Sequence, residues 1–205
     1  MDISRSQLTK DGRPAGTPHF TSEETLMTEK RHSFVLTKDE LFYSGKKILD
    51  VGCGYGSGPK YMITHGAKEV TAIDFNLAAI DIAKEHFSDA SIRYVHGVFP
   101  SAVFGYGPFD VITALEFVEH VTDVELLEFL LYAKIALKDD GFLYVTTPKR
   151  RLPKNCYPQG SHWTEYGFDE LVGIFEQHGF VLEWSASPKE TDGISMALLF
   201  CNKER

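Results

Sequence analysis

Two carboxylates and an imidazole lie close together in the segment Glu116-Phe117-Val118-Glu119-His120. If a helical turn begins at Glu116, then Glu119 and His120 follow three and four positions later and share its face. Groups that converge in this way can ligate a divalent cation such as Mg²⁺ or Mn²⁺. They can equally supply a general base for a hydroxyl substrate. His162, later in the chain, can join either arrangement.

These residues define two overlapping predictions. The candidate metal ligands are Glu116, Glu119, His120 and His162, and the candidate catalytic groups are His120, His162 and Glu119. The structural alternative is that Glu116 only lines a pocket and that His120 is a partly buried imidazole without a chemical role. The residue pattern leaves these alternatives open.

A glycine-rich loop follows the first strongly apolar run of the chain. Its acidic and glycine residues are Asp50, Gly52, Gly54 and Gly56. Glycine lets the backbone turn sharply and approach a ligand closely. A dinucleotide-binding fingerprint is excluded, because it would need glycine or alanine at Ser57 or at Pro59, depending on where it starts. A P-loop is excluded as well, since no Gly-Lys-Ser/Thr follows. The Asp50 carboxylate would repel a pyrophosphate but suits a cationic amino group.

Asp74 is the second acidic residue of interest, because it ends the apolar run Val70–Asp74. An acid at the tip of a second strand is placed to accept hydrogen bonds from ribose hydroxyls. Phe75 beside it can pack on the face of an adenine ring. The structural alternative is that Asp74 caps the helix that Asn76 begins.

The elements that must position these residues alternate between short apolar runs and longer helical patterns. The predicted strands are 47–51, 70–74, 92–96, 109–115 and 142–147. The predicted helices are 57–65, 77–87, 123–137 and 167–178, with an earlier helix starting near Ser22. This alternation predicts βαβ units and a parallel sheet that binds ligands at the carboxyl ends of its strands. Two further strands, 180–187 and 195–202, are close enough in sequence to form an antiparallel hairpin.

The length of 205 residues suits one domain, and we expect an N-terminal arm over 1–20 and the domain over 21–205. A formal net charge of −8 argues against binding to a nucleic acid backbone. The three cysteines are widely spaced, which favours free thiols in a reducing compartment. With no secretion signal or membrane span in the pattern, we expect a cytoplasmic protein.

The chain resembles the class I S-adenosylmethionine (SAM)-dependent methyltransferases from about residue 20 to residue 202. The matching features are Asp50-x-Gly52-x-Gly54-x-Gly56, Asp74, Phe109-Asp110-Val111-Ile112, the run from Leu137 to Phe142, and Thr146-Thr147-Pro148. The resemblance implies a doubly wound, Rossmann-like α/β fold with a seven-stranded, mostly parallel sheet and a C-terminal antiparallel hairpin. It also implies that SAM is the cofactor.

The same resemblance implies roles for particular residues. Gly52, Gly54 and Gly56 would line the methionine part of SAM, and Asp74 would hold its ribose. The family often has Gly-Asp after the third strand, whereas this chain has Gly97-Val98-Phe99. Adenine is therefore expected to be held by backbone groups and by apolar contact. The remaining predicted cofactor contacts are Asp50, Phe75, Val98, Phe99 and Leu115.

The family suggests several acceptors. Ubiquinone-pathway O-methyltransferases and small-RNA 2′-O-methyltransferases have a similar Glu-x-x-Glu-His and use a divalent metal there, and other features resemble glycan-biosynthesis members. We predict O-methylation of a hydroxyl on a small molecule or sugar. The alternatives are a metal-dependent RNA 2′-O-methyltransferase and a non-catalytic SAM-binding module. The basic run Lys149-Arg150-Arg151, near Tyr157 and Trp163, predicts an anionic group on the acceptor, unless it is only a solvated loop.

Overall fold

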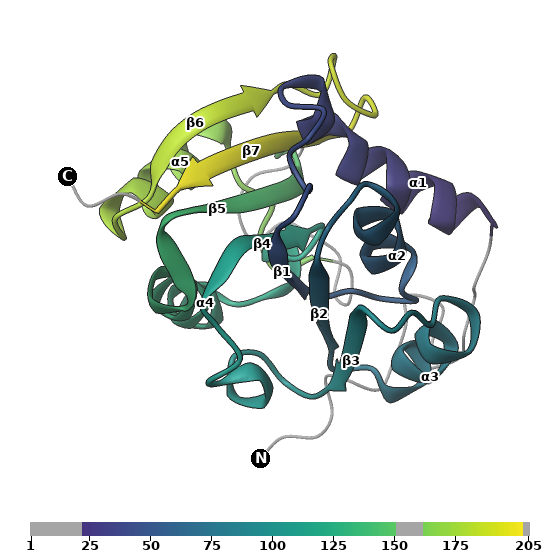
Figure 1. The fold of residues 1–205 in the computed structure, drawn as a ribbon. Coiled ribbons are helices and arrows are strands. Elements are labelled where there is room, and N and C mark those ends of the chain that lie inside the picture. The colour runs from purple at the N-terminus through teal and green to yellow at the C-terminus, as the bar shows by residue number, and fades with distance from the viewer. Residues whose placement is uncertain (1–21, 151–161, 203–205) are drawn as a thin grey trace.

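The computed structural model describes residues 22–150 and 162–202, so the predicted arm over 1–20 lies outside the described residues. Seven strands form one sheet in the order β3-β2-β1-β4-β5-β7-β6 (Figure 1). The strands are β1 Lys47–Val51, β2 Glu69–Asp74, β3 Ile92–His96, β4 Phe109–Leu115, β5 Leu137–Pro148, β6 Val181–Ala186 and β7 Ser195–Cys201. Strands β1 to β5 are parallel, and β7 pairs antiparallel with both β5 and β6. The predicted mostly parallel sheet with a C-terminal hairpin is therefore confirmed.

Helices cover both faces of the sheet, as a doubly wound fold requires. They are α1 Ser22–Phe34, α2 Ser57–Thr64, α3 Leu77–His86, α4 Asp123–Ala136 and α5 Phe168–Gln177, with short 3₁₀ turns η1 Val35–Thr37, η2 Ser101–Val103 and η3 Val118–His120. One apolar core lies under α4 and α5 and includes Phe129 and Phe175. The other lies under α1 to α3 and includes Phe34, Met62 and Ile80. Among the described residues, no helix combines the length and the hydropathy needed to cross a membrane.

The parallel register brings three strand ends together. Val51 of β1 lies opposite Ile73 of β2, and Asp50 of β1 lies opposite Thr113 of β4. The residues that follow these strands therefore meet at one edge of the sheet, where the sequence predicts the glycine loop, Asp74 and the Glu116 segment.

Candidate active site

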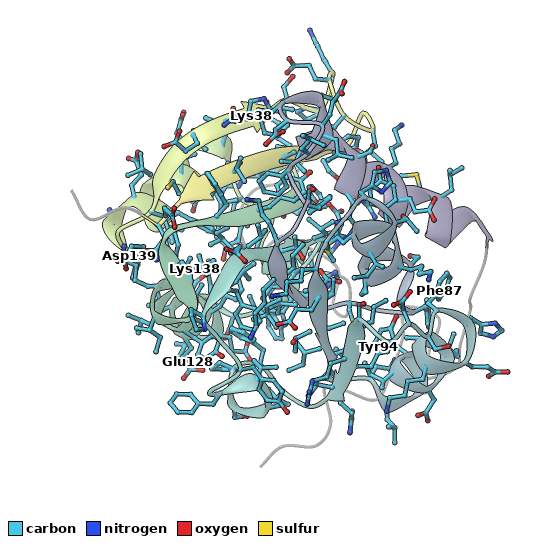
Figure 2. All side chains as sticks on the ribbon, viewed as in Figure 1. Lys38, Phe87, Tyr94, Glu128, Lys138 and Asp139 are labelled. Carbon is cyan, nitrogen blue, oxygen red and sulfur yellow. The ribbon has the colours of Figure 1, made fainter. Side chains whose placement is uncertain are left out.

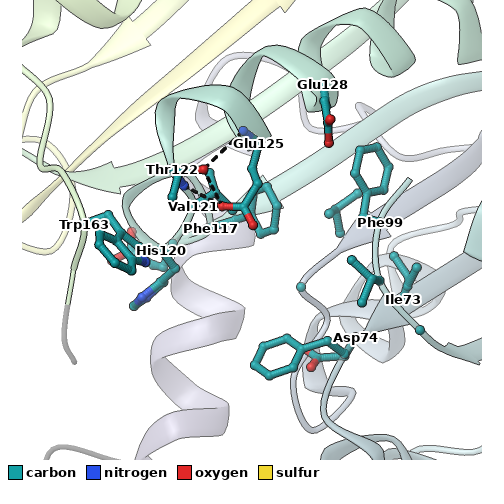
Figure 3. A pocket seen from close by; sticks show the side chains of 16 residues that line it. Ile73, Asp74, Phe99, Phe117, His120, Val121, Thr122, Glu125, Glu128 and Trp163 are labelled. Carbon is teal, nitrogen blue, oxygen red and sulfur yellow. Dashed lines mark hydrogen bonds between the residues drawn. The ribbon is translucent and has the colours of Figure 1, made fainter. Parts of the chain in front are cut away.

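A cavity of about 480 Å³ opens at this edge of the sheet. That volume is within the range of sites for cofactors and small molecules. Figure 3 shows His120 and Trp163 on one side of the cavity and Asp74, Ile73 and Phe99 on the other. The glycine-loop side and the Glu116–His120 segment thus face one space.

The three loop glycines serve different purposes. All three have positive φ, at 76° for Gly52, 53° for Gly54 and 95° for Gly56. Gly52 lines the cavity, whereas a Cβ at Gly56 would come within 2.7 Å of Ala83 Cβ and of Tyr94 Oη. Gly56 therefore allows close packing against α3 and β3, and neither it nor Gly54 lines this cavity.

Asp74 is oriented by the loop that precedes α2. Its Oδ2 accepts a hydrogen bond from the Gly54 N–H at 2.9 Å, and its Oδ1 accepts one from the Asn76 N–H at 2.9 Å. Burial raises the pKa of Asp74, and these backbone donors partly offset that effect. Each carboxylate oxygen can accept a second hydrogen bond, and Asp74 lines the cavity. The residues therefore fit a ligand that presents a pair of hydroxyls.

The cap of α3 decides against the structural alternative for Asp74. The Asn76 side chain accepts hydrogen bonds from the Ala78 and Ala79 N–H groups. Asn76, not Asp74, is thus the N-cap of α3. The Asp74 carboxylate stays directed at the loop and the cavity.

Asp50 lies behind the loop and does not line the cavity. It is buried and accepts a hydrogen bond from Thr113 Oγ1 at 2.5 Å. Burial raises its pKa to about 7, against the opposing effect of the Thr113 bond. Asp50 therefore joins β1 to β4 through Thr113, and any contact with a cationic amino group stays a prediction.

The apolar residues expected around adenine divide into two groups. Phe75, Val98 and Phe99 line the cavity, with Phe75 and Val98 exposed at its mouth. Phe99 is anchored by ring contacts to α4, 5.3 Å from Phe129 between centroids. Leu115 lies elsewhere, against the core under α1 to α3.

The predicted helical turn beginning at Glu116 is wrong. Glu116 has φ 52°, its N–H donates to the Thr146 carbonyl, and the 3₁₀ turn η3 begins only at Val118. Its carboxylate accepts from Thr146 Oγ1 at 3.0 Å and lies 3.2 Å from the Arg31 guanidinium of α1. Burial raises the pKa of Glu116, and the charge of Arg31 opposes that shift. The Glu116 carboxylate thus already forms an ion pair with Arg31 of α1.

Glu119 is the most buried member of the polar cluster. Its Oε2 accepts from Thr147 Oγ1 at 3.0 Å, whereas its buried Oε1 has no hydrogen-bond partner among the described residues. Burial, and next the negative charge of Glu116, hold the pKa of Glu119 well above its usual range. Such a group favours either a proton or a bound cation.

Two histidines complete the cluster. The His120 and His162 rings meet edge to face with centroids 5.0 Å apart. His162 Nδ1 lies 2.9 Å from Oε1 of the buried Glu165, which favours the tautomer protonated at Nδ1. One ligand atom each from Glu119, His120 and His162 lies within 4.8 Å of the others. The structure therefore brings together three of the four predicted ligands, without Glu116.

The basic run has a structural use. Arg150 forms an ion pair with Glu170 of α5, and its Nε donates to the Glu165 carbonyl at 3.0 Å. Lys149 is exposed, and Arg151 and Tyr157 lie outside the described residues. Arg150 thus holds the His162–Glu165 segment in place. Because its guanidinium is already paired with Glu170, Arg150 does not support the interpretation that the basic run binds an anionic group on the acceptor.

Several residues of the site escape sequence reasoning. Arg31 gives no local signal, because only the folded chain brings α1 to the end of β4. Glu125 lines the cavity, and its capping box with Thr122 was available as a Thr-x-x-Glu pattern. Trp163, which the sequence analysis named beside the basic run, does line the cavity, and its backbone N–H donates to the Glu119 carbonyl at 2.7 Å.

Comparison with known proteins gives one family and a set of relatives. Residues 23–186 match a family described as a methyltransferase domain. The chain is 36% identical over 134 residues to the mitochondrial ubiquinone biosynthesis O-methyltransferase of Schizosaccharomyces pombe. This match covers 62% of this chain and 47% of that protein. It is 34% identical over 134 residues to the ubiquinone biosynthesis O-methyltransferase of Haemophilus ducreyi, which covers 62% of this chain and 55% of the relative. The chain thus spans about half the length of these curated relatives.

The fold has a solved counterpart. A crystal structure of an S-adenosylmethionine-dependent methyltransferase from Mesorhizobium loti superposes with a TM-score of 0.67 at 17% identity, over 84% of this chain and 97% of that one. At this level of identity the likeness supports the architecture alone.

Proposed function

This chain belongs to the methyltransferase domain family, and from that premise we propose that it is an SAM-dependent O-methyltransferase acting on a hydroxyl of a small molecule. The observation that carries the proposal is the shared cavity: Asp74 and Gly52 face the same space as His120. A cofactor site and a group able to handle a hydroxyl proton are therefore neighbours.

The cofactor would be held by residues at the ends of β1, β2 and β3. Asp74 would accept hydrogen bonds from the ribose hydroxyls, and Gly52 would let the backbone approach closely. Phe75, Val98 and Phe99 would cover the adenine with apolar surface. When bound, SAM supplies a methyl group on an already activated sulfonium, so the chain's main task is to align the acceptor oxygen.

The polar cluster would handle the acceptor's proton. Without a metal, His120 would meet the acceptor hydroxyl, because it is the member of the cluster that lines the cavity. His162 lies beside it, and the Glu165 carboxylate orients the His162 ring and would stabilise its protonated form, so either histidine would serve as the base, with Glu119 close to both. A non-catalytic SAM-binding module would have no use for this cluster.

The same three side chains also fit a divalent cation. The supporting observation is the buried Glu119 Oε1 without a hydrogen-bond partner among the described residues. Glu119, His120 and His162 would hold the ion, which would supply Lewis acidity toward the acceptor oxygen. Two imidazoles favour Mn²⁺ over Mg²⁺, since Mg²⁺ prefers oxygen ligands.

For the acceptor we propose a hydroxylated ring. Trp163 and Phe117 line the cavity next to His120 and offer aromatic surface for stacking. The relatives are named as O-methyltransferases of ubiquinone biosynthesis, and a hydroxyl of a small molecule or sugar is the prediction from sequence. A cytoplasmic location also stays a prediction.

Methyl transfer from labelled SAM tests this function with three acceptor groups: catechol-like phenols, sugars and oligoribonucleotides. We expect turnover with a small hydroxylated acceptor and none with RNA. Excess chelator separates the two versions of the cluster: loss of activity that Mn²⁺ restores supports the cation, and full activity supports a histidine of the cluster as the base. Methylation of RNA alone, or of no acceptor, contradicts the proposal.

A further inference from the structure

The wall of the cavity that α4 contributes carries an acid opposite the proposed ribose site. Glu128 of α4 lines the cavity, as do Asp74 and Phe99. Figure 3 shows Glu128 and Asp74 at opposite ends of this space, with Phe99 between them. A ligand that is held at Asp74 and covered by Phe99 would therefore extend toward Glu128.

Phe99 and Glu128 are neighbours on the surface of α4. The Phe99 ring lies 5.3 Å from Phe129 and 5.0 Å from Tyr132, measured between ring centroids. Glu128 directly precedes Phe129 and lies four residues before Tyr132, which places Glu128 and Tyr132 on the same side of the helix. Phe99 thus packs against the part of α4 from which the Glu128 side chain extends. A base in contact with Phe99 would have the Glu128 carboxylate next to one of its edges.

The side chains that would cover the adenine cannot satisfy its amino group. Phe75, Val98 and Phe99 can contact the faces of the base, but none of them can accept a hydrogen bond through its side chain. The 6-amino group has two N–H donors and lies on the edge of the base remote from the ribose. A carboxylate suits this group, because it accepts hydrogen bonds and its charge strengthens them.

Two carboxylates of α4 reach the cavity, and they are not equivalent. Glu125 Oε2 already accepts from the Thr122 N–H and from the Thr122 hydroxyl, each at 2.7 Å, as part of the helix cap. Glu128 lies three residues further along α4, beyond the cap, and is exposed (Figure 2). Among the described residues that line the cavity there is no lysine or arginine, so no cationic side chain of the cavity wall competes for the Glu128 carboxylate. Glu128 is therefore the better placed acceptor.

We propose that Glu128 accepts a hydrogen bond from the adenine 6-amino group of SAM and thereby selects adenine over 6-oxo purines. The inference rests on the proposed function, because it takes the cavity as the SAM site. A 6-oxo purine presents an oxygen at the same place, so two hydrogen-bond acceptors would face each other. Since Glu128 is exposed and water competes for the bond, we expect a preference of about tenfold.

Calorimetric titration of the full chain with S-adenosylhomocysteine and with S-inosylhomocysteine, its 6-oxo counterpart, tests the inference. The two compounds differ only in the purine, and neither can transfer a methyl group. The wild type should bind the adenine compound about tenfold more tightly, and Glu128→Ala should reduce this preference to about threefold or less. Glu128→Gln should bind the inosine compound more tightly than the wild type does, because its amide N–H can donate to the 6-oxo group. A merely structural role of Glu128 would not produce this gain.

Glu85→Ala removes an exposed carboxylate of α3 and is the control, whose preference should stay within about twofold of that of the wild type. Glu125→Gln separates the two acids of α4, and its amide oxygen can still accept from Thr122. A wild type without a preference, or a preference that both Glu128 variants retain, would overturn the inference and leave the proposed function standing. A preference that is lost in Glu125→Gln instead would also overturn it. A folded wild type that binds neither SAM nor S-adenosylhomocysteine would overturn both the inference and the proposed function.

Discussion

At the scale of one residue, Glu119 is a carboxyl group whose burial opposes its ionisation. The fold buries its carboxylate and provides one donor, from Thr147, for its two oxygens. Burial and the charge of Glu116 raise the pKa of Glu119 to about 8, so near pH 7 the carboxyl favours a proton or a bound cation. We propose that this proton or cation serves the acceptor hydroxyl.

The variant Glu119→Gln separates stability from function. The amide oxygen can still accept the Thr147 hydrogen bond, and no charge is buried, so thermal stability should be equal or higher. Methyl transfer should fall by about 10²- to 10⁴-fold, as for a lost acid–base group or ligand. Turnover and thermal unfolding are measured together, with Glu85→Gln, an exposed residue of α3, as the control. Undiminished turnover would remove Glu119 from the mechanism.

A second residue-scale prediction concerns stability and pH. His32 of α1 is buried against Tyr43, and burial lowers its pKa from 6.5 to about 3. Above pH 6.5 the imidazole is neutral in both states and its contribution is complete. As pH falls from 6.5 toward 3, only the unfolded chain takes up the proton, so stability is lost through that window.

Urea unfolding at pH 7 and pH 5 measures this effect. One fully displaced titration changes stability by about 1.4 kcal/mol per pH unit. The wild type should therefore lose roughly 1–2 kcal/mol more than His32→Gln between the two pH values. Equal losses in both proteins would mean that His32 is protonated in the folded chain.

At the scale of elements, the glycine loop joins β1, α2 and α3 through two different constraints. Gly54 and Gly56 share a left-handed backbone, yet a Cβ at Gly54 would meet nothing within 4 Å. Gly54→Ala should therefore cost about 1–2 kcal/mol, the backbone cost alone. Gly56→Ala should cost about 1–3 kcal/mol more, because its Cβ would press on Ala83 and Tyr94. Chemical denaturation compares the two, and equal costs would contradict the packing role of Gly56.

The elements themselves were largely predictable. Strands β1, β3 and β4 begin and end as expected from their apolar runs, and β5 starts earlier, at Leu137, through a register shift against β4. Hydrophobic periodicity and turn residues depend on neighbouring positions of the chain, so they can be recognised from the sequence alone. The edge of the sheet that holds the site follows from the parallel order of the strands.

The fine structure of the site was not predictable, because it depends on contacts between distant segments. The ion pair of Arg31 with Glu116 joins α1 to the residue that follows β4, and the hydrogen bond from Trp163 to Glu119 joins the segment before α5 to η3. Glu116 itself leaves the expected helical turn for a left-handed conformation, which a sequence pattern for glutamate does not predict. Contacts between segments far apart in the sequence determine the conformation and the partners of these residues.

At the scale of the whole molecule, charge restricts the partner. The net charge is −8, and Arg150 is already paired with Glu170. Binding of a single RNA strand through several phosphates would weaken with salt at a log–log slope of about −0.7 per phosphate. We expect no oligoribonucleotide binding in the micromolar range by fluorescence anisotropy at moderate salt. Tight binding with a slope steeper than about −2 would support the RNA alternative.

The central claim is that the cavity between Asp74 and His120 binds SAM, and calorimetric titration tests it most directly. The folded wild type should bind SAM, and Asp74→Ala should bind it roughly 10- to 150-fold more weakly, as for the loss of about 1.5–3 kcal/mol from a charged hydrogen bond. Asp81→Ala, an exposed aspartate of α3, should match the wild type. A folded wild type that does not bind SAM, or a folded Asp74→Ala with unchanged affinity, would contradict the account.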